Sequence, residues 1–367
     1  MGIRKLSSFT IAATYIGTVV GAGFASGQEV LQFFSFFGLK SIPALALAVI
    51  LFAFFGGIVL NLGQRLRAKS YLEIVRYAGG PYLGRVVDAI VTFFLFGGLT
   101  AMAAGAGAIF TEQFGLSKVL GSSIMLIASL ITVLLGFYGV VLSISFVVPV
   151  LLLSVLGLSV AALSTVPLDL GAISAWTGKV DPAIPWWPLS ALTYVSYNLV
   201  LSIAILAPLG AKAASANALR NGALLGGLGL GLGALAINLA ILTMPVQAAG
   251  FEVPMIYIAG QFSPAVLAGY GAVLLAEIYT TAVASLYGFT VRFTDPETIR
   301  SKRLAAAVAA VAFIASLLGF SVLVRYLYAA VGVAGFLLLG GLTYGLLRER
   351  IGSLRERIDF LRARTKL

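Results

Sequence analysis

The sequence predicts an all-α polytopic membrane protein with ten transmembrane helices. Its 367 residues are 60% hydrophobic and only 10% charged, whereas ordinary globular proteins are about half apolar and about one quarter charged. So few charges could not cover the surface of a soluble protein of this length. The long unbroken apolar runs also exclude a transmembrane β-barrel, whose strands alternate in polarity over about ten residues.

Ten apolar segments are long enough to cross a bilayer, for which a helix needs about 20 residues. The expected spans are 8–37, 41–65, 85–112, 118–138, 140–164, 187–210, 219–245, 265–290, 303–324 and 327–347. Two short amphipathic helices are expected in the membrane interfaces, at 70–78 and 253–262. The chain then divides into a first five-helix repeat at 1–165, a connecting loop at 166–185, a second repeat at 186–347 and a basic tail at 348–367.

The basic residues support this number of spans and give an orientation. If both termini lie on one side, only four of the 24 Lys and Arg residues fall on the other side, namely Lys40, Lys118, Lys179 and Arg325. Basic loops stay in the cytoplasm, so we expect a multi-pass protein of the cytoplasmic membrane with both termini cytoplasmic. The net charge of +11 is therefore a topology signal, and no nucleic-acid partner is expected.

The C-terminal tail is expected to be an amphipathic helix. Ile351, Leu354, Ile358 and Leu361 share one helical face, and arginines fill the opposite face. This pattern fits a helix that binds anionic lipid in the membrane interface. It fits equally well a solvated segment that only fixes the orientation of the last span.

The composition also limits the chemistry. There is no cysteine and no histidine, which excludes disulfides, iron–sulfur clusters, haem ligation, most zinc sites and Cys or Ser–His nucleophilic catalysis. No nucleophile–base pair is evident, so the protein is not expected to be an enzyme. No cofactor is expected, apart from Na⁺ as a candidate coupling ion.

The first span is unusually rich in glycine. Gly17, Gly21, Gly23 and Gly27 lie within eleven residues, and each glycine weakens a helix by about 1 kcal/mol relative to alanine. We therefore expect an unwound stretch from about Gly17 to Ser26. Such a stretch is tolerated in a membrane where it lines a cavity, and it offers carbonyls to a cation and N–H groups to an anion. The alternative is close helix packing through GxxxG pairs.

Two carboxylates lie deep in the expected spans, where polar groups are functional candidates. Ser26 and Glu29 match a capping box, so Glu29 either caps the second half of the broken span or takes part in substrate or proton binding. Glu277, Thr280 and Thr281 share one helix face and offer hard oxygen ligands for a small cation. Alternatively, Glu277 is a protonated structural residue and the threonines bond back to their own helix.

The two halves begin alike. The first spans of the two halves open with TYIG at Thr14–Gly17 and TYVS at Thr193–Ser196. Because each half has five spans, the second must be inverted relative to the first. An inverted repeat with a glycine-broken first helix is typical of secondary transporters.

The segment VGAGFASGQEVLQFF at Val20–Phe34 resembles the YkvI-type family of bacterial membrane proteins. Its Gly21-Ala22-Gly23-Phe24 core also resembles the broken-helix motif of the amino acid–polyamine–organocation superfamily, which has the LeuT fold. The resemblance implies five-plus-five inverted repeats, alternating access and a substrate between the first and sixth helices. The chain departs from the superfamily's pattern in the sixth span, which has no glycine between Ser190 and Pro208. The sequence therefore gives little indication of a break in that span.

The resemblance also implies roles for individual residues. The candidate substrate-binding residues are Gly21, Ala22, Gly23, Phe24, Ala25, Glu29, Tyr194, Tyr197, Asn198 and Ser202. A sodium site would combine the carbonyls of Gly17 and Val20 with Thr280 and Thr281, with Glu277 one turn earlier. The fifth span lacks the lysine that some proton-coupled relatives carry, which favours sodium or protonation of Glu277 as the coupling device.

These observations predict a secondary active transporter of a small polar or zwitterionic solute, amino-acid-like, coupled to Na⁺ or H⁺. An ion channel or exchanger lined by Glu29 and Glu277 is the first alternative. A ligand-sensing receptor on the same fold is the second.

Overall fold

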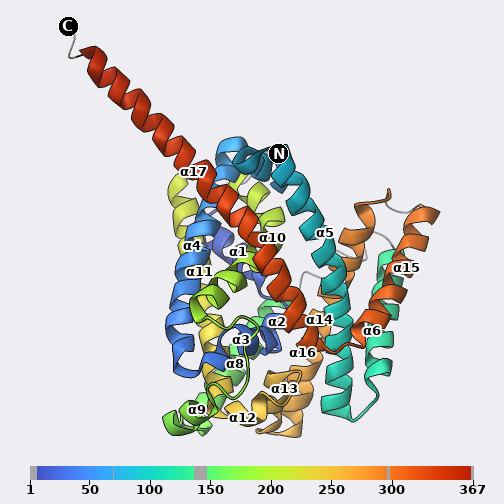
Figure 1. Ribbon diagram of the computed structural model, residues 1–367. Helices are drawn as coiled ribbons and strands as arrows, with labels where there is room; N and C mark the ends of the chain where they lie inside the picture. The colour runs from blue at the N-terminus through green and yellow to red at the C-terminus, as the bar shows by residue number, and fades with distance from the viewer. Residues whose placement is uncertain (1–5, 69, 136–146, 296–297, 365–367) are drawn as a thin grey trace.

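The computed structural model describes residues 6–68, 70–135, 147–295 and 298–364, and this part of the chain is built of helices (Figure 1). Six helices are long and apolar enough to cross a membrane, and a bent pair at Val150–Thr165 and Leu170–Trp176 would make a seventh. Ser8–Val19 and Lys118–Leu134 are apolar but shorter. The count of ten spans therefore remains a prediction, and residues 140–146 of the expected fifth span lie outside the described residues.

The first expected span is interrupted. Its elements are α1 (Ser8–Val19), α2 (Ala22–Ala25), α3 (Gln28–Phe33) and the 3₁₀ turn η1 (Ser35–Lys40). Extended backbone at Val20 and Gly21 separates α1 from α2, and Gly27 lies between α2 and α3 with φ +80°. The interruption is narrower than the expected stretch from Gly17 to Ser26. Helical bonding continues to the Val20 N–H, which donates to the Ile16 carbonyl at 2.8 Å, so one glycine at position 17 does not end α1.

The rest of the first half follows the expected order. It consists of α4 (Ser41–Leu66), α5 (Tyr71–Phe114), α6 (Lys118–Leu134), α8 (Val147–Thr165) and α9 (Leu170–Trp176). The expected interfacial helix at 70–78 and the third span both belong to α5. Gly80 divides them with φ +76°, immediately before Pro81, which has no N–H group for helical bonding.

The second half begins with an unbroken helix. Its elements are α10 (Trp187–Ala211), α11 (Ala216–Thr243), α12 (Pro245–Ala248), α13 (Pro254–Gly260), α14 (Pro264–Val291), α15 (Ile299–Ser316), α16 (Phe320–Leu323), η2 (Val324–Tyr328) and α17 (Ala329–Arg364). The break in the sixth span that the LeuT-fold resemblance implies is thus absent from α10. The expected boundary at residue 348 is not a break either, because α17 continues beyond it. Side chains from residue 349 onward lie outside the described part, so both interpretations of the tail stay predictions.

The long helices pack in two groups. One contains α1, α4, α10 and α11, and the other contains α5, α6, α14 and α15. Each predicted half contributes its first two helices to one group and its third and fourth to the other, although the five-plus-five repeat itself stays a prediction. The interrupted segment, residues 20–33, lies between the groups, because α2 contacts α14 while α3 contacts α10 and α11.

Buried polar contacts fix the end of the interrupted segment. Asn238 of α11 accepts a hydrogen bond from the Ser35 hydroxyl at 2.8 Å and donates to the Ser41 hydroxyl at 2.9 Å. Ser190 of α10 donates to the Phe33 carbonyl at 2.8 Å. Since buried polar groups lose free energy unless they are paired, these contacts hold the segment against α10 and α11.

Two carboxylates fasten the connection between α12 and α13. Glu112 of α5 accepts from the N–H groups of Glu252, at 2.5 Å, and Val253, at 3.1 Å. Glu252 in turn accepts from the Phe320 N–H at 2.5 Å, where α16 begins. This chain of contacts joins α5 to the first turn of the last long helical segment, and it gives Glu112 a structural partner.

Candidate functional site

A cavity of about 260 Å³ opens where the interrupted segment faces α5, α10 and α14. Eleven of the residues predicted from sequence line it, namely Gly17, Val20, Gly21, Ala22, Gly23, Glu29, Tyr197, Asn198, Glu277, Thr280 and Thr281. The volume lies just below the roughly 300–1,000 Å³ of pockets for drug-sized ligands. The cavity is therefore suited to a small molecule.

Four predicted site residues are buried but do not line the cavity. Phe24 packs towards α11, where a Cβ built on Gly233 would lie 3.1 Å from the Phe24 ring. The Ala25 carbonyl accepts from the Tyr270 hydroxyl at 2.5 Å. Tyr194 lies edge-on to Tyr197 with ring centroids 5.4 Å apart, and Ser202 is 1% exposed. Phe24, Ala25 and Tyr194 thus support the lining residues from behind.

Glu29 is joined to α10. Its carboxyl group accepts a hydrogen bond from the Tyr197 hydroxyl, and it lies against the backbone of Gly23, where an added Cβ would overlap Glu29 Oε1. Only a residue without a side chain leaves room for the carboxyl group there. Gly23 thus serves the placement of Glu29, which the glycine pattern alone did not reveal.

The capping-box interpretation of Ser26 and Glu29 is wrong. The Ser26 N–H donates to the Ala22 carbonyl at 2.8 Å, because α2 forms a complete helical turn. The Ser26 hydroxyl accepts from the Gln28 N–H at 3.2 Å and donates to the Gly23 carbonyl at 2.7 Å. The N–H group that Glu29 would have capped is therefore already paired, and the Glu29 carboxyl group is bonded to α10 instead.

Glu277, Thr280 and Thr281 meet the interrupted segment from α14. The Thr281 side chain lies close to the Glu277 carboxyl group, whose Oε2 atom has no hydrogen-bond partner in the described part of the chain. Thr280 donates back to the Glu277 carbonyl at 3.0 Å. A Cβ built on Gly21 would lie 4.0 Å from Thr281 Oγ1. The predicted oxygen cluster therefore faces the break directly.

The break also places backbone carbonyl acceptors and backbone N–H donors beside the cavity. The last carbonyls of a helix and its first N–H groups have no partners within that helix, and the end of α1 and the start of α2 both line the cavity. The Ala25 N–H is not among the available donors, because it donates to the Gly21 carbonyl at 2.9 Å. Gly17 and Val20, at the end of α1, and Ala22 and Gly23, at the start of α2, line the cavity, and their backbone groups stay candidate contacts for a ligand.

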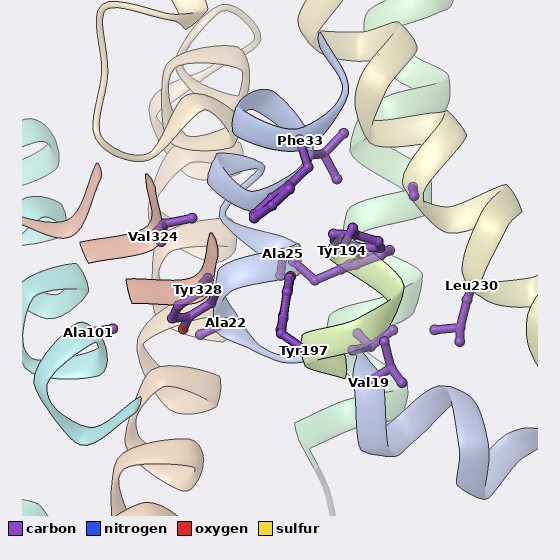
Figure 2. Packing of buried hydrophobic residues seen from close by; sticks show 14 of the residues in the cluster. Val19, Ala22, Ala25, Phe33, Ala101, Tyr194, Tyr197, Leu230, Val324 and Tyr328 are labelled. Atoms are coloured by element: carbon purple, nitrogen blue, oxygen red, sulfur yellow. The ribbon is translucent and has the colours of Figure 1, made fainter. Parts of the chain in front are cut away.

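Sequence reasoning missed an aromatic wall of the cavity. Phe94 of α5 and Tyr328 of η2 line it together with Tyr197, and the three ring centroids are 5.1–6.4 Å apart. Figure 2 shows Tyr197 and Tyr328 beside Ala22 and Ala25 of the interrupted segment. In the sequence, nothing distinguishes Phe94 from the many other apolar residues. Tyr328 ends a π-helical turn, a feature often found at functional sites but without a sequence signature.

Comparisons with known proteins agree with this architecture, although no family model matches the chain. Among solved structures of similar fold, MhsT in complex with L-phenylalanine has a TM-score of 0.55 at 18% identity, over 93% of this chain and 88% of that one. A Na⁺-coupled sialic acid symporter has a TM-score of 0.56 at 15% identity, over 91% of this chain and 77% of the symporter. The Eremococcus coleocola manganese transporter has a TM-score of 0.57 at 13% identity, over 93% of this chain and 78% of that one. The fold is thus that of LeuT-type transporters.

Two proteins found by sequence comparison have a higher sequence identity to this chain than these solved structures do. The uncharacterized protein YyaD of Bacillus subtilis is 26% identical over 88% of this chain and 92% of its own length. The uncharacterized membrane protein YkvI of Bacillus subtilis is 32% identical over 92% of this chain and 96% of its own length. The chain therefore belongs to the family of YkvI.

Proposed function

We propose that the protein is a secondary active transporter of a small zwitterionic or polar organic solute, with an amino-acid-like compound as the first candidate. The observation that carries the proposal is the cavity at the interrupted helix, which combines a buried carboxyl group, free backbone groups and aromatic rings. An interrupted membrane helix that lines a cavity near the middle of the fold is the usual substrate site of this class of transporter.

The cavity contains candidate partners for both charges of a zwitterion. The Ala22 N–H group, at the start of α2, would donate to a carboxylate. The Glu29 carboxyl group, held by Tyr197, would accept from an ammonium group. The rings of Phe94 and Tyr328 bound the remaining space, so an apolar or aromatic substrate side chain would bury its surface against them.

The coupling ion would bind on the α14 side of the same cavity. Carbonyls of Gly17 and Val20, the hydroxyls of Thr280 and Thr281 and the Glu277 carboxyl group supply oxygen ligands of the kind that small hard cations prefer. If the ion is sodium, Glu277 Oε2 gains the partner that it lacks in the described structure. If the coupling ion is a proton, Glu277 itself carries it.

Uptake into proteoliposomes tests the proposal. We expect saturable accumulation of one or more radiolabelled amino acids, driven by an inward gradient of Na⁺ or of protons. Glu277→Gln should abolish the response to whichever gradient drives uptake. Asp181→Asn, which changes an exposed acidic residue in the loop before α10, is the matched control and should transport normally. Thr281→Ala separates the two ions, because it should weaken Na⁺ dependence strongly and proton dependence little.

A second candidate function is transport of an inorganic cation itself. It is favoured by the presence of two carboxyl groups, those of Glu29 and Glu277, in one cavity. In that case ²²Na⁺ or ⁵⁴Mn²⁺ uptake would saturate without any organic solute, and both Glu29→Gln and Glu277→Gln would abolish it. Uptake of an amino acid that requires Na⁺ in stoichiometric amounts would exclude this second function.

A further inference from the structure

A second hollow lies on the outer side of the molecule, away from the interrupted segment. It has a volume of about 600 Å³ and runs between α4 and α11, which pack side by side. Its polar lining comes from Asn61 and Arg65 of α4 and from Asn217 and Arg220 of α11. These four side chains gather at the end of α4 and the start of α11, near the same membrane surface. We call this hollow the α4–α11 groove.

The rest of the groove is apolar and widens towards the arginines. Where the helices are close, a Cβ on Gly227 would lie 2.9 Å from the Ala53 nitrogen. One turn nearer the arginines, a Cβ on Gly57 would lie 3.7 Å from the Ala223 Cβ. Phe54 and Leu224 border the groove and are 48% and 52% exposed, so the groove is open to the lipid side of the helices.

Charge complementarity identifies the kind of ligand. None of the described residues that line the groove is acidic, and the predicted topology puts its arginine end on the side of the membrane that carries the basic excess. Arginine binds phosphate oxygens in a planar, two-pronged geometry, and basic hollows between membrane helices on the cytoplasmic side bind anionic lipid headgroups. Arginines at one end and an open apolar channel at the other match the two parts of a phospholipid.

We propose that the α4–α11 groove binds one anionic phospholipid. Arg65 and Arg220 hold the phosphodiester, and Asn61 and Asn217 bond the polar headgroup. An acyl chain lies along Gly57 and Ala223, between Phe54 and Leu224. The lipid bridges two helices of the group that contains α1, so its binding stabilises that group by mass action.

Lipid retention and thermal unfolding test the proposal. The purified protein is exchanged into neutral detergent and titrated with phosphatidylglycerol or with phosphatidylcholine of the same acyl chains, while bound lipid is followed by native mass spectrometry. We expect one phosphatidylglycerol to be retained and to raise the unfolding temperature, with phosphatidylcholine much weaker. Arg65→Gln combined with Arg220→Gln should weaken phosphatidylglycerol binding about 30-fold, because each basic residue near an anionic lipid contributes about fivefold.

Two further variants make the result specific. Lys302→Gln combined with Arg303→Gln removes the same charge from exposed positions outside the groove and should bind phosphatidylglycerol as the wild type does. Gly57→Leu keeps both arginines but fills the acyl channel, and it should also lose the lipid.

Three outcomes would overturn the proposal, two of which need only the wild-type protein. One is equal retention of phosphatidylglycerol and phosphatidylcholine. The second is an equal thermal shift with inorganic phosphate or glycerol phosphate, which would show an anion site rather than a lipid site. The third is unchanged phosphatidylglycerol binding in both groove variants.

Discussion

The first span and α10 occupy the same position in the two predicted halves, yet the first span is broken and α10 is a continuous helix of 25 residues. Both open with a Thr-Tyr pair, and both tyrosines are buried. Tyr15 donates to the Phe52 carbonyl at 2.9 Å, whereas the Tyr194 hydroxyl has no hydrogen-bond partner in the described part of the chain. The sequence likeness of the two openings therefore does not extend to their structure.

Glycine accounts for much of the difference. Gly27 adopts a left-handed conformation that other residues avoid, and Gly23 leaves room for the Glu29 carboxyl group. Between Ser190 and Pro208, α10 has no glycine and keeps its backbone bonded. The broken segment thus presents backbone groups and the Glu29 side chain to the cavity, while the unbroken helix presents the side chains of Tyr197 and Asn198.

The largest effect is expected from Gly23→Ala. The added methyl group overlaps Glu29 Oε1, so the carboxyl group must swing away and lose its bond to Tyr197. Because only the end of a flexible side chain moves, the folded protein should remain, but substrate-dependent stabilisation and uptake should be lost. Gly269→Ala is the control, since nothing lies within 4 Å of the added atom. Normal uptake by Gly23→Ala would show that the placement of Glu29 does not matter.

Gly27→Ala is expected to lower the free energy of unfolding by about 2–3 kcal/mol. The left-handed conformation alone costs about 1–2 kcal/mol in a residue with a side chain. The new Cβ would also lie 2.9 Å from Met255 Cγ, which adds the cost of overpacking. Unfolding in detergent by a chemical denaturant measures the difference. A change below about 0.5 kcal/mol would mean that the segment re-forms without its left-handed turn.

Two phenylalanine substitutions in α10 should differ by about 2 kcal/mol. Tyr197→Phe leaves the buried Glu29 carboxyl group without its donor, and an unsatisfied buried group costs about 1–3 kcal/mol. Tyr194→Phe removes a hydroxyl that has no partner in the described structure, so its effect should be close to zero. The same unfolding assay compares them. Equal effects would contradict the contact between Tyr197 and Glu29.

The smallest effect is expected from Ala204→Gly, which places a glycine at an exposed position within α10. It should cost about 1 kcal/mol of stability without breaking the helix, because α10 remains packed against α4 and α17. Hydrogen exchange should show protected amides through residues 200–207. Rapid exchange there would mean that a single glycine suffices to open the helix, and that packing contributes less than we infer.

Most of the secondary structure could be predicted from the sequence, because apolar runs of the required length are a local property of the chain. The helices α4, α10, α11 and α14 lie within a few residues of their predicted spans. The glycines of the first span likewise indicated that the helix would break. Oxygen ligands at positions 277, 280 and 281 could be grouped because helical periodicity alone places them on one face.

Tertiary contacts decided what these residues do. The sequence offered Ser26 as the partner of Glu29, but the early closure of α2 used up the Ser26 N–H, and packing against α10 brought Tyr197 to the carboxyl group instead. Phe94 and Tyr328 joined the cavity through contacts between segments more than 200 residues apart, which no local pattern encodes. The sequence by itself determined where helices form and where one of them is weak, since both follow from short-range backbone preferences and hydrophobicity. Only the packing of the two helix groups determined which side chains meet at the weak point, because that depends on which surfaces are buried together.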